Sequence, residues 1–290
     1  MDKKTRILID TDIGGDVDDA LALALALNTP SLEVTGITNV YLANAWRAGV
    51  TKHFLEVYGR TDIPVCTGAE KPLIGWWDEN RIPDSSPDYG EERGGKLPHA
   101  SDFIIEKCMA DPELVIVAIG PLTNLGLAFA KAPHIARGRR VVMMGGDPSQ
   151  SIREWNILCD PEAAEIVLES GANIEMVGCD MTRRCQFTEA EVDEVAKAGN
   201  PRTDMLGQMM RQFTKNFGYL PILHDPLALS VLVWDDILTF ETQRIHIERA
   251  GSFTRGLTIP VGGSDGAEIR VATEVRVAEF KRRMIEVLKQ

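Results

Sequence analysis

Two short apolar runs place the strongest limit on the folds open to this chain. Leu114–Ile119 reads LVIVAI and Arg140–Met144 reads RVVMM, and each run ends at a glycine. A strand that is apolar on both sides must be covered on both sides, which is typical of parallel sheets flanked by helices. The two runs therefore favour an α/β architecture.

Strand and helix patterns alternate along all 290 residues. Strands are expected over Arg6–Ile9, Glu33–Val40, Pro64–Thr67, Leu114–Ile119, Arg140–Met144, Ile174–Gly178 and Glu268–Val277. Helices are expected over Ala20–Leu27, Ala45–Gly59, Ala100–Ala110, Thr123–Ala132, Pro161–Ser170, Thr188–Ala198, Asp225–Val233 and Ala278–Lys289. This order predicts one α/β domain, residues 1–290, with a mainly parallel sheet and helices on both faces.

Two segments depart from the alternation. Residues 75–95 are rich in Pro, Asp, Gly and Trp and are too long for a simple connection. We expect this segment to be an active-site flap. Residues 203–221 are expected to form a second rim element, in which Phe213, Phe217 and Tyr219 are available to cover a ligand.

Charge and cysteine content narrow the classes of partner and compartment. The net charge of −12 argues against a nucleic-acid-binding surface, which needs clustered Lys and Arg. No apolar stretch is long enough to span a bilayer, and the N-terminus has no apolar signal segment. The five cysteines contain no CxxC pair, so we expect reduced thiols and a cytoplasmic protein without a membrane partner.

Five aspartates follow the first expected strand in DTDIGGDVDDALAL: Asp10, Asp12, Asp16, Asp18 and Asp19. In an open parallel sheet, ligands bind beyond the carboxyl ends of the strands. Carboxylates crowded into a compact turn repel one another, and a hard cation with oxygen ligands would offset that repulsion. The cluster therefore predicts a metal site, with Ca²⁺ as the expected ion, in a hydrolase.

The sequence around the aspartate cluster does not match other common phosphate-binding or metal-binding motifs. An EF-hand would need a Glu at position twelve of its loop, and a P-loop would need GK[ST]. The alternative is a phosphatase of the haloacid dehalogenase type, with Asp10 as nucleophile and Asp12 as acid. That enzyme would also need a late Lys and a late acidic pair, for which the sequence offers no convincing arrangement.

Three later segments add polar groups at expected strand ends. In AIGPLTNLGLA, Thr123 could cap a helix or offer its carbonyl to a metal. In REWNILCDPEAA, the triplet Glu154, Trp155 and Asn156 could bind sugar hydroxyls or be a loop with one buried Trp.

The third segment, LHDPLAL, places His224 and Asp225 at a helix start. The carboxylate suits a metal ligand, and the imidazole suits a proton donor.

The ordered set of these segments resembles the nucleoside hydrolase family, the inosine–uridine-preferring nucleoside hydrolases. DTDIGGDVDDALAL is similar to the N-terminal aspartate motif of that family. GPLTNL, MMGG, EWN with DPEAA, and HDPLA follow in the family's order, together with IPVCTGAEKPL and the ending VATEVRVAEF. The resemblance covers nearly the whole chain and implies a Rossmann-like sheet.

The resemblance implies Ca²⁺-dependent hydrolysis of the N-glycosidic bond of ribonucleosides, which gives ribose and free base. The implied metal ligands are Asp12, Asp19, Asp225 and the backbone carbonyl of Thr123. Asp12 would also be the general base for a metal-bound water, which is easier to deprotonate than free water. His224 would lie near the leaving base.

The implied substrate-binding residues are Asp18, Asn44, Tyr89, Glu154, Trp155 and Asn156. Breaking the C1′–N bond builds oxocarbenium character on the ribose, which carboxylates stabilise. The resemblance further implies a homodimer or homotetramer that acts in nucleoside salvage on a small-molecule ribonucleoside.

Three departures from the family pattern affect substrate contacts. Two residues are inserted between Gly14 and Asp18, so Asp16 has no assigned role. Asn44 stands one residue away from the family's Asn after the second strand, and Tyr89 stands where some members have His. These changes motivate a second hypothesis, a catalytically weak relative that binds ribosides.

Overall fold

The structure is a computed structural model that describes residues 3–75, 98–150 and 152–290. Within these ranges the chain forms one mixed sheet in the order β3-β2-β1-β4-β5-β6-β9-β7-β8. The strands are β1 (Thr5–Thr11), β2 (Leu32–Asn39), β3 (Val65–Thr67), β4 (Val115–Ala118), β5 (Arg140–Met144), β6 (Asn173–Val177), β7 (Leu238–Ile247), β8 (Thr258–Pro260) and β9 (Ala267–Val275).

The expected parallel sheet is confirmed, and an antiparallel edge extends it. Every pairing from β3 across to β9 is parallel. The strand β7 runs antiparallel to both β9 and β8, and neither β7 nor β8 was expected from the sequence. Alternate positions of β7 are exposed, so it lacks the continuous apolar run that marks the central strands.

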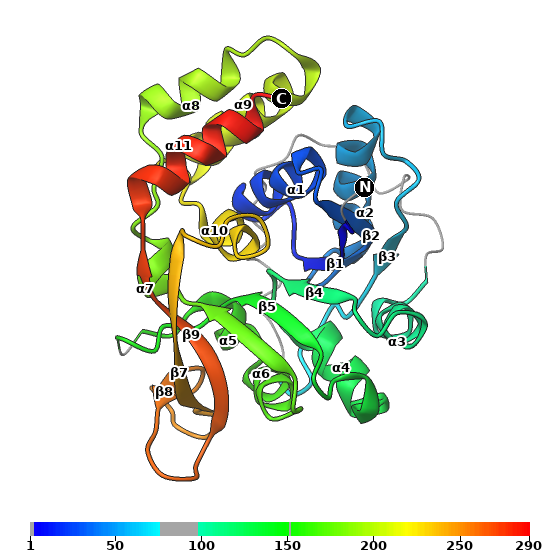
Figure 1. Cartoon of the computed structure of the whole chain (residues 1–290), viewed down its shortest axis with the longest axis vertical. Helices are drawn as coiled ribbons and strands as arrows, with labels where there is room; N and C mark the ends of the chain where they lie inside the picture. The colour runs from blue at the N-terminus through cyan, green and yellow to red at the C-terminus, as the bar shows by residue number, and fades with distance from the viewer. Residues whose placement is uncertain (1–2, 76–97, 151) are drawn as a thin grey trace.

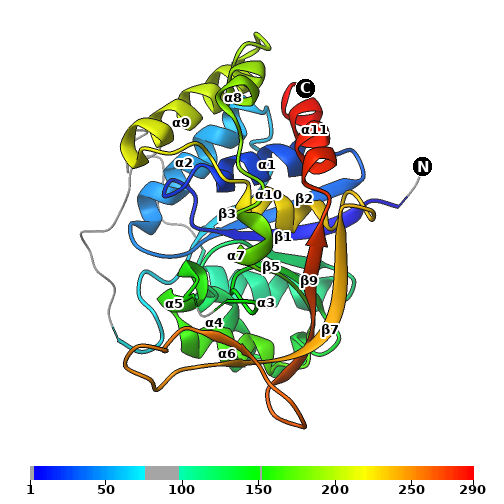
Figure 2. The same cartoon turned by 90° about the vertical axis from the view of Figure 1, so that its left-hand side faces the viewer.

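Helices cover both faces of the sheet, as expected (Figures 1 and 2). They are α1 (Asp18–Asn28), α2 (Asn44–Val57), α3 (Ala100–Ala110), α4 (Thr123–Lys131), α5 (Trp155–Cys159), α6 (Pro161–Leu168), α7 (Cys179–Thr182), α8 (Glu189–Ala196), α9 (Pro201–Phe217), α10 (His224–Ser230) and α11 (Val277–Leu288), with a short 3₁₀ turn at Pro133–Ile135. Figure 2 shows α1, α9, α10 and α11 on one side of the sheet and α3, α4 and α6 on the other.

Successive residues of the central strands enter two different cores. Val117 of β4 packs with the helices α1, α9 and α11, whereas Ile116 packs with α3, α4 and α6. This arrangement follows from the alternation of side chains along a strand. It explains why the central strands must be apolar at every position.

The helix α1 holds the last two members of the aspartate cluster in place. Almost all of its side chains are buried, and it packs against α10 and α11. Its Ala and Leu residues are strong helix formers, so the ALALALAL run is helical despite its alternation. Asp18 and Asp19 form its first turn, where the helix dipole favours negative charge.

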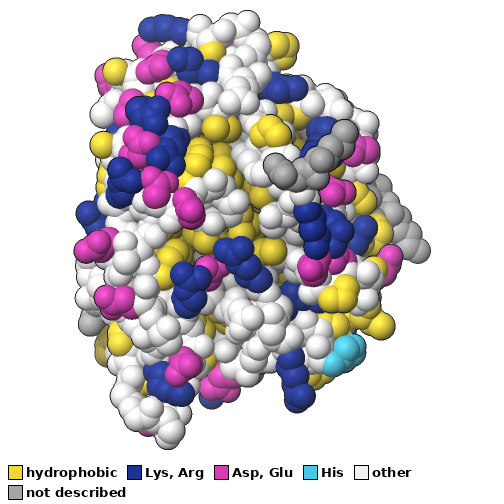
Figure 3. All heavy atoms as spheres, in the orientation of Figure 1, with side chains coloured by type: hydrophobic (Ala, Val, Ile, Leu, Met, Phe, Trp, Pro, Cys, Tyr) yellow, Lys and Arg dark blue, Asp and Glu magenta, His cyan; other side chains and the backbone are white. Residues whose placement is uncertain are grey.

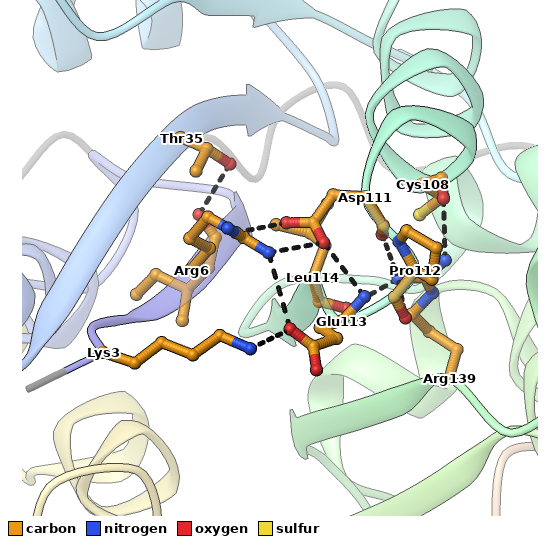
Figure 4. Close-up of polar contacts among 10 residues, drawn as sticks. Lys3, Arg6, Thr35, Cys108, Asp111, Pro112, Glu113, Leu114 and Arg139 are labelled. Carbon is orange, nitrogen blue, oxygen red and sulfur yellow. Dashed lines mark hydrogen bonds and ion pairs between the residues drawn. The ribbon is translucent and has the colours of Figure 1, made fainter.

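Two arginines tie together the end of the sheet opposite the expected site (Figure 4). Arg6 on β1 forms an ion pair with Asp111, with Nη2 donating to Oδ1 at 2.8 Å. Arg139, 6 % exposed, donates at 2.8–3.1 Å to the carbonyls of Cys108, Asp111, Pro112 and Leu114. These bonds satisfy the Cys108 carbonyl in the last turn of α3 and the carbonyls of the loop that leads from α3 to β4.

The C-terminal helix is held by ion pairs on the surface. Arg283 contacts Asp236 and Glu279, and Lys281 contacts Glu191 of α8. Figure 3 shows basic and acidic side chains mixed over α11 and α8 on this face of the molecule. Among the described residues, no helix is long and apolar enough to cross a membrane.

Candidate active site

A cavity of about 750 Å³ lies where the carboxyl ends of β1, β4, β5 and β6 meet. Its walls come from the segments that follow these strands, together with the end of α9 and the start of α10. This is the edge at which open parallel sheets bind ligands. The volume lies within the range of about 300–1,000 Å³ that is typical of small-molecule sites.

Three buried carboxylates meet at one side of the cavity. Asp18, Asp19 and Asp225 each offer an oxygen atom, and these oxygens lie within 4.8 Å of one another. All three residues are at most 4 % exposed. The Asp225 backbone N–H donates to Asp18 Oδ2 at 3.3 Å, which joins the start of α10 to the start of α1.

The described residues therefore contain an acidic group that could hold a metal ion. Two oxygens on one Ca²⁺ are separated by at most about 5 Å, because each Ca–O bond is about 2.3–2.6 Å. Burial, followed by the charges of Asp16 and Asp19, raises the pKa of Asp18 well above its ordinary value. Burial and the charge of Asp18 do the same to the pKa of Asp225. A cation would remove both penalties, so the donor set fits a hard divalent ion.

Asp12 lines the same cavity, and a buried arginine fixes its backbone. The Arg47 guanidinium, 1 % exposed, donates to the carbonyls of Asp12, Ile13 and Leu42. Burial raises the pKa of the Asp12 carboxyl, and the charge of Arg47 opposes that rise. Arg47 was not anticipated, because one Arg in an amphipathic helix carries no recognisable signal.

Glu154 and Asn156 lie together beyond the end of β5. Glu154 caps α5 by accepting from the Asn156 and Ile157 backbone N–H groups at 2.8 and 3.1 Å, and it also accepts from Gly146 N. The Asn156 amide Nδ2 donates to the carbonyls of Ile119 and Met144 at 3.2 and 3.3 Å. Both side chains line the cavity with the aspartates.

Aromatic side chains form another part of the wall. Trp155, 39 % exposed, packs edge-on against Tyr41 with ring centroids 6.3 Å apart. Phe217 and Tyr219, from the predicted rim element, also line the cavity. Tyr41 has a φ of 74°, an uncommon backbone conformation for a residue with a Cβ.

His224 is joined to α7 at the edge of the carboxylate group. Its Nδ1 is 2.6 Å from Thr182 Oγ1. Burial, followed by the charge of Arg183, lowers the pKa of His224 to about 4. The imidazole is therefore neutral near pH 7.

Two predicted site residues, Asn44 and Thr123, are not among the described residues whose side chains line the cavity. Asn44 donates to the carbonyls of Tyr41 and Ala69 at 2.7 and 3.0 Å. Thr123 is buried and donates its hydroxyl to Asp160 Oδ2 at 2.7 Å. Tyr89 and the predicted flap after Gly75 lie outside the described residues.

A family comparison decides which class of enzyme this cavity belongs to. The model of the inosine-uridine preferring nucleoside hydrolase family matches residues 7–282. The chain belongs to this family. It is therefore a hydrolase that acts on N-glycosyl bonds.

Individual members support the same assignment across nearly the full length. The inosine-uridine preferring nucleoside hydrolase of Crithidia fasciculata is 31 % identical over 282 residues, covering 88 % of this chain and 87 % of the relative. The pyrimidine-specific ribonucleoside hydrolase RihA of Klebsiella pneumoniae is 33 % identical, with 87 % of each chain covered. A solved plant nucleoside hydrolase, PpNRh1, matches with a TM-score of 0.86 and 27 % identity over 98 % of this chain and 99 % of its own.

In this nucleoside hydrolase, Asp10 has a supporting position rather than that of a nucleophile. It is fully buried, and its Oδ1 accepts from Thr38 and from Asn124 Nδ2. Asp10 is not among the described residues that line the cavity. The phosphatase alternative, which needs Asp10 to attack a substrate, has no support in this geometry.

Proposed function

We propose that this nucleoside hydrolase binds Ca²⁺ and uses it to hydrolyse ribonucleosides to ribose and free base. The observation that carries the proposal is the buried group Asp18, Asp19 and Asp225 at the strand ends, with Asp12 in the same cavity. The residues proposed to hold the ion are Asp12, Asp19, Asp225 and the carbonyl of Thr123. When bound, Ca²⁺ would fix the ribose diol and make water in the site easier to deprotonate.

The protein side chains have separate roles in the proposed reaction. Asp12 takes a proton from the attacking water. Asp18, Glu154 and Asn156 hold ribose hydroxyls, and the carboxylates of Asp18 and Glu154 stabilise the positive charge that develops on the sugar. Within the described ranges Glu154 Oε1 accepts one backbone N–H, which leaves it able to accept a hydrogen bond from a hydroxyl.

The base is proposed to occupy the aromatic part of the cavity. Trp155 would stack on it, and His224, neutral near pH 7, would contribute an N–H hydrogen bond rather than transfer a proton from an imidazolium. The named specificities of the relatives differ, since they include pyrimidine-specific and purine-preferring enzymes. We therefore propose a ribonucleoside substrate without a stated base.

A panel of purine and pyrimidine ribonucleosides, assayed for free base with and without a chelator, tests the proposal. We expect base release that a chelator abolishes and Ca²⁺ restores. Release that is insensitive to chelation would contradict the metal requirement. Nucleoside binding in calorimetry without base release from any nucleoside would instead support the second hypothesis, a catalytically weak relative that binds ribosides. The shifted position of Asn44 motivates that hypothesis.

We also propose a cellular location and an oligomeric state for this enzyme. All five cysteines are buried and free, which supports the proposal of a reducing cytoplasm. The proposed release of base and ribose fits a role in nucleoside salvage. We propose a homodimer or homotetramer, which light scattering of the purified protein would measure directly.

A further inference from the structure

Three arginines line the cavity, and they differ in what their N–H groups contact. The guanidinium of Arg47 is taken up by backbone carbonyls. Arg153 is exposed, and within the described part of the chain no buried carboxylate holds it. Arg183, directly after α7, combines a fixed position with access to the cavity.

The position of Arg183 is set by a buried carboxylate. Its Nη1 lies 3.5 Å from Oδ2 of Asp147, which is fully buried. Neither carboxylate oxygen of Asp147 has a hydrogen bond of ordinary geometry within the described residues. A buried carboxylate is stabilised by a nearby counter-charge, so Asp147 favours this position of the Arg183 guanidinium. At 3.5 Å this ion pair uses few of the five guanidinium N–H groups.

Arg183 lines the cavity and follows directly on α7, which contacts the start of α10. The preceding residue, Thr182, contacts His224, and His224 adjoins Asp225 of the carboxylate group. In the proposed function the carboxylate end takes the ribose, because its vicinal hydroxyls are oxygen ligands for a hard cation. The aromatic base must then lie in the remaining space, which Arg183 borders together with aromatic side chains.

We infer that Arg183 is a catalytic residue that donates hydrogen bonds to the departing base. This inference rests on the proposed function. As the C1′–N bond breaks, its electron pair stays on the base, while the water oxygen bonds to C1′ and gives a proton to Asp12. The guanidinium keeps its own protons and stabilises the anionic base, which then takes up one proton by way of solvent. Such a donor, fixed in advance where charge develops, is an effective form of catalysis.

The test compares two substrates whose leaving groups differ in their need for stabilisation. Hypoxanthine leaves inosine as a poorly stabilised base anion, whereas 4-nitrophenolate leaves 4-nitrophenyl β-D-ribofuranoside as an anion that is already stable. In Arg183→Gln we expect kcat on inosine to fall about 100-fold. The kcat on the nitrophenyl riboside should fall less than about threefold, because that leaving group needs little help.

Arg184→Gln is the matched control, since Arg184 is exposed and contacts Met181 Sδ rather than the cavity. It should leave both substrates unchanged. Asp147→Asn should show the same substrate bias as Arg183→Gln to a smaller extent, which identifies Asp147 as a positioning residue. Arg183→Lys keeps the charge and should retain the bias with a smaller loss, so it serves if the Gln variant does not fold.

Parallel losses on both substrates, or no loss on inosine, would overturn the role of Arg183. Wild-type enzyme that cleaves the nitrophenyl riboside but no nucleoside would also count against it, because Arg183 would then give no help to a poor leaving group. Wild-type protein that cleaves neither the nitrophenyl riboside nor any purine or pyrimidine nucleoside of the panel in the presence of Ca²⁺ would overturn the proposed function itself, and Arg183 with it.

Discussion

Repulsion among the buried carboxylates of Asp18, Asp19 and Asp225 should destabilise the metal-free protein. Removing one of these charges should therefore stabilise it. Two unit charges 4.8 Å apart repel by about 3.5 kcal/mol at an effective dielectric constant near 20. Asp225 faces both Asp18 and Asp19 at about this distance or less. Partial protonation and solvent reduce the repulsion, so we expect Asp225→Asn to gain about 2 kcal/mol without metal. For a chain of this size that is about 4 °C in Tm.

With Ca²⁺ present the order should reverse. A ligand at 100 times its Kd stabilises the folded state by about 2.7 kcal/mol, and the Asn variant has one charged ligand fewer. Wild-type protein should therefore gain about 5 °C between excess EDTA and excess Ca²⁺, while the variant gains little.

Calorimetric melting of both proteins in EDTA and in Ca²⁺ measures the effect. Asp235→Asn is the control, because Asp235 is exposed and carries the same charge away from the cavity. It should change neither Tm nor the response to Ca²⁺. Equal melting of the wild type in both buffers, or a variant that is less stable in EDTA, would refute the electrostatic reasoning.

Other predictions concern catalysis, binding and folding. Asp12→Asn should lower kcat about 100- to 10,000-fold with an unchanged circular dichroism spectrum, and substantial remaining activity would contradict its role as base. Trp155→Ala should raise KM about 5- to 100-fold through the loss of stacking, with kcat little changed, as steady-state kinetics would show. Arg139→Ala should lower the free energy of unfolding by about 3 kcal/mol in urea, because buried carbonyls lose their donor. Arg137→Ala, an exposed control, should stay within about 0.5 kcal/mol of the wild type.

The central strands and most helices could be predicted because their signals are local. The run RVVMM is strand β5 with the expected bounds, and the expected helix from Ala100 to Ala110 is α3. Doubly buried strands are apolar at every position, and Asp160 with Pro161 marks a helix start by its own chemistry. These features depend on residues that are close together in the sequence, so they can be predicted without knowledge of the tertiary structure.

The segment from Pro201 to Ile247 was harder to predict. The helix α9 has a start signal in Asn200 and Pro201, yet its aromatic end suggested a rim element rather than a helix of 17 residues. The strand β7 alternates polar and apolar side chains and pairs only with later strands, β8 and β9. Its place in the sheet depends on partners that come 11 or more residues later in the chain.

The sequence by itself determined the parallel sheet, because doubly buried strands are apolar at every position. It also predicted a cation site at the carboxyl edge of that sheet, because aspartates crowded behind an apolar strand repel one another unless a cation binds them. Only the tertiary structure decided which carboxylates meet, since Asp225 joins Asp18 and Asp19 from more than 200 residues away. It also showed the ion pair of Arg183 with Asp147 and the burial of Arg47. Single charged residues leave no pattern in a sequence, and their effect depends on which buried groups the fold brings within a few ångströms.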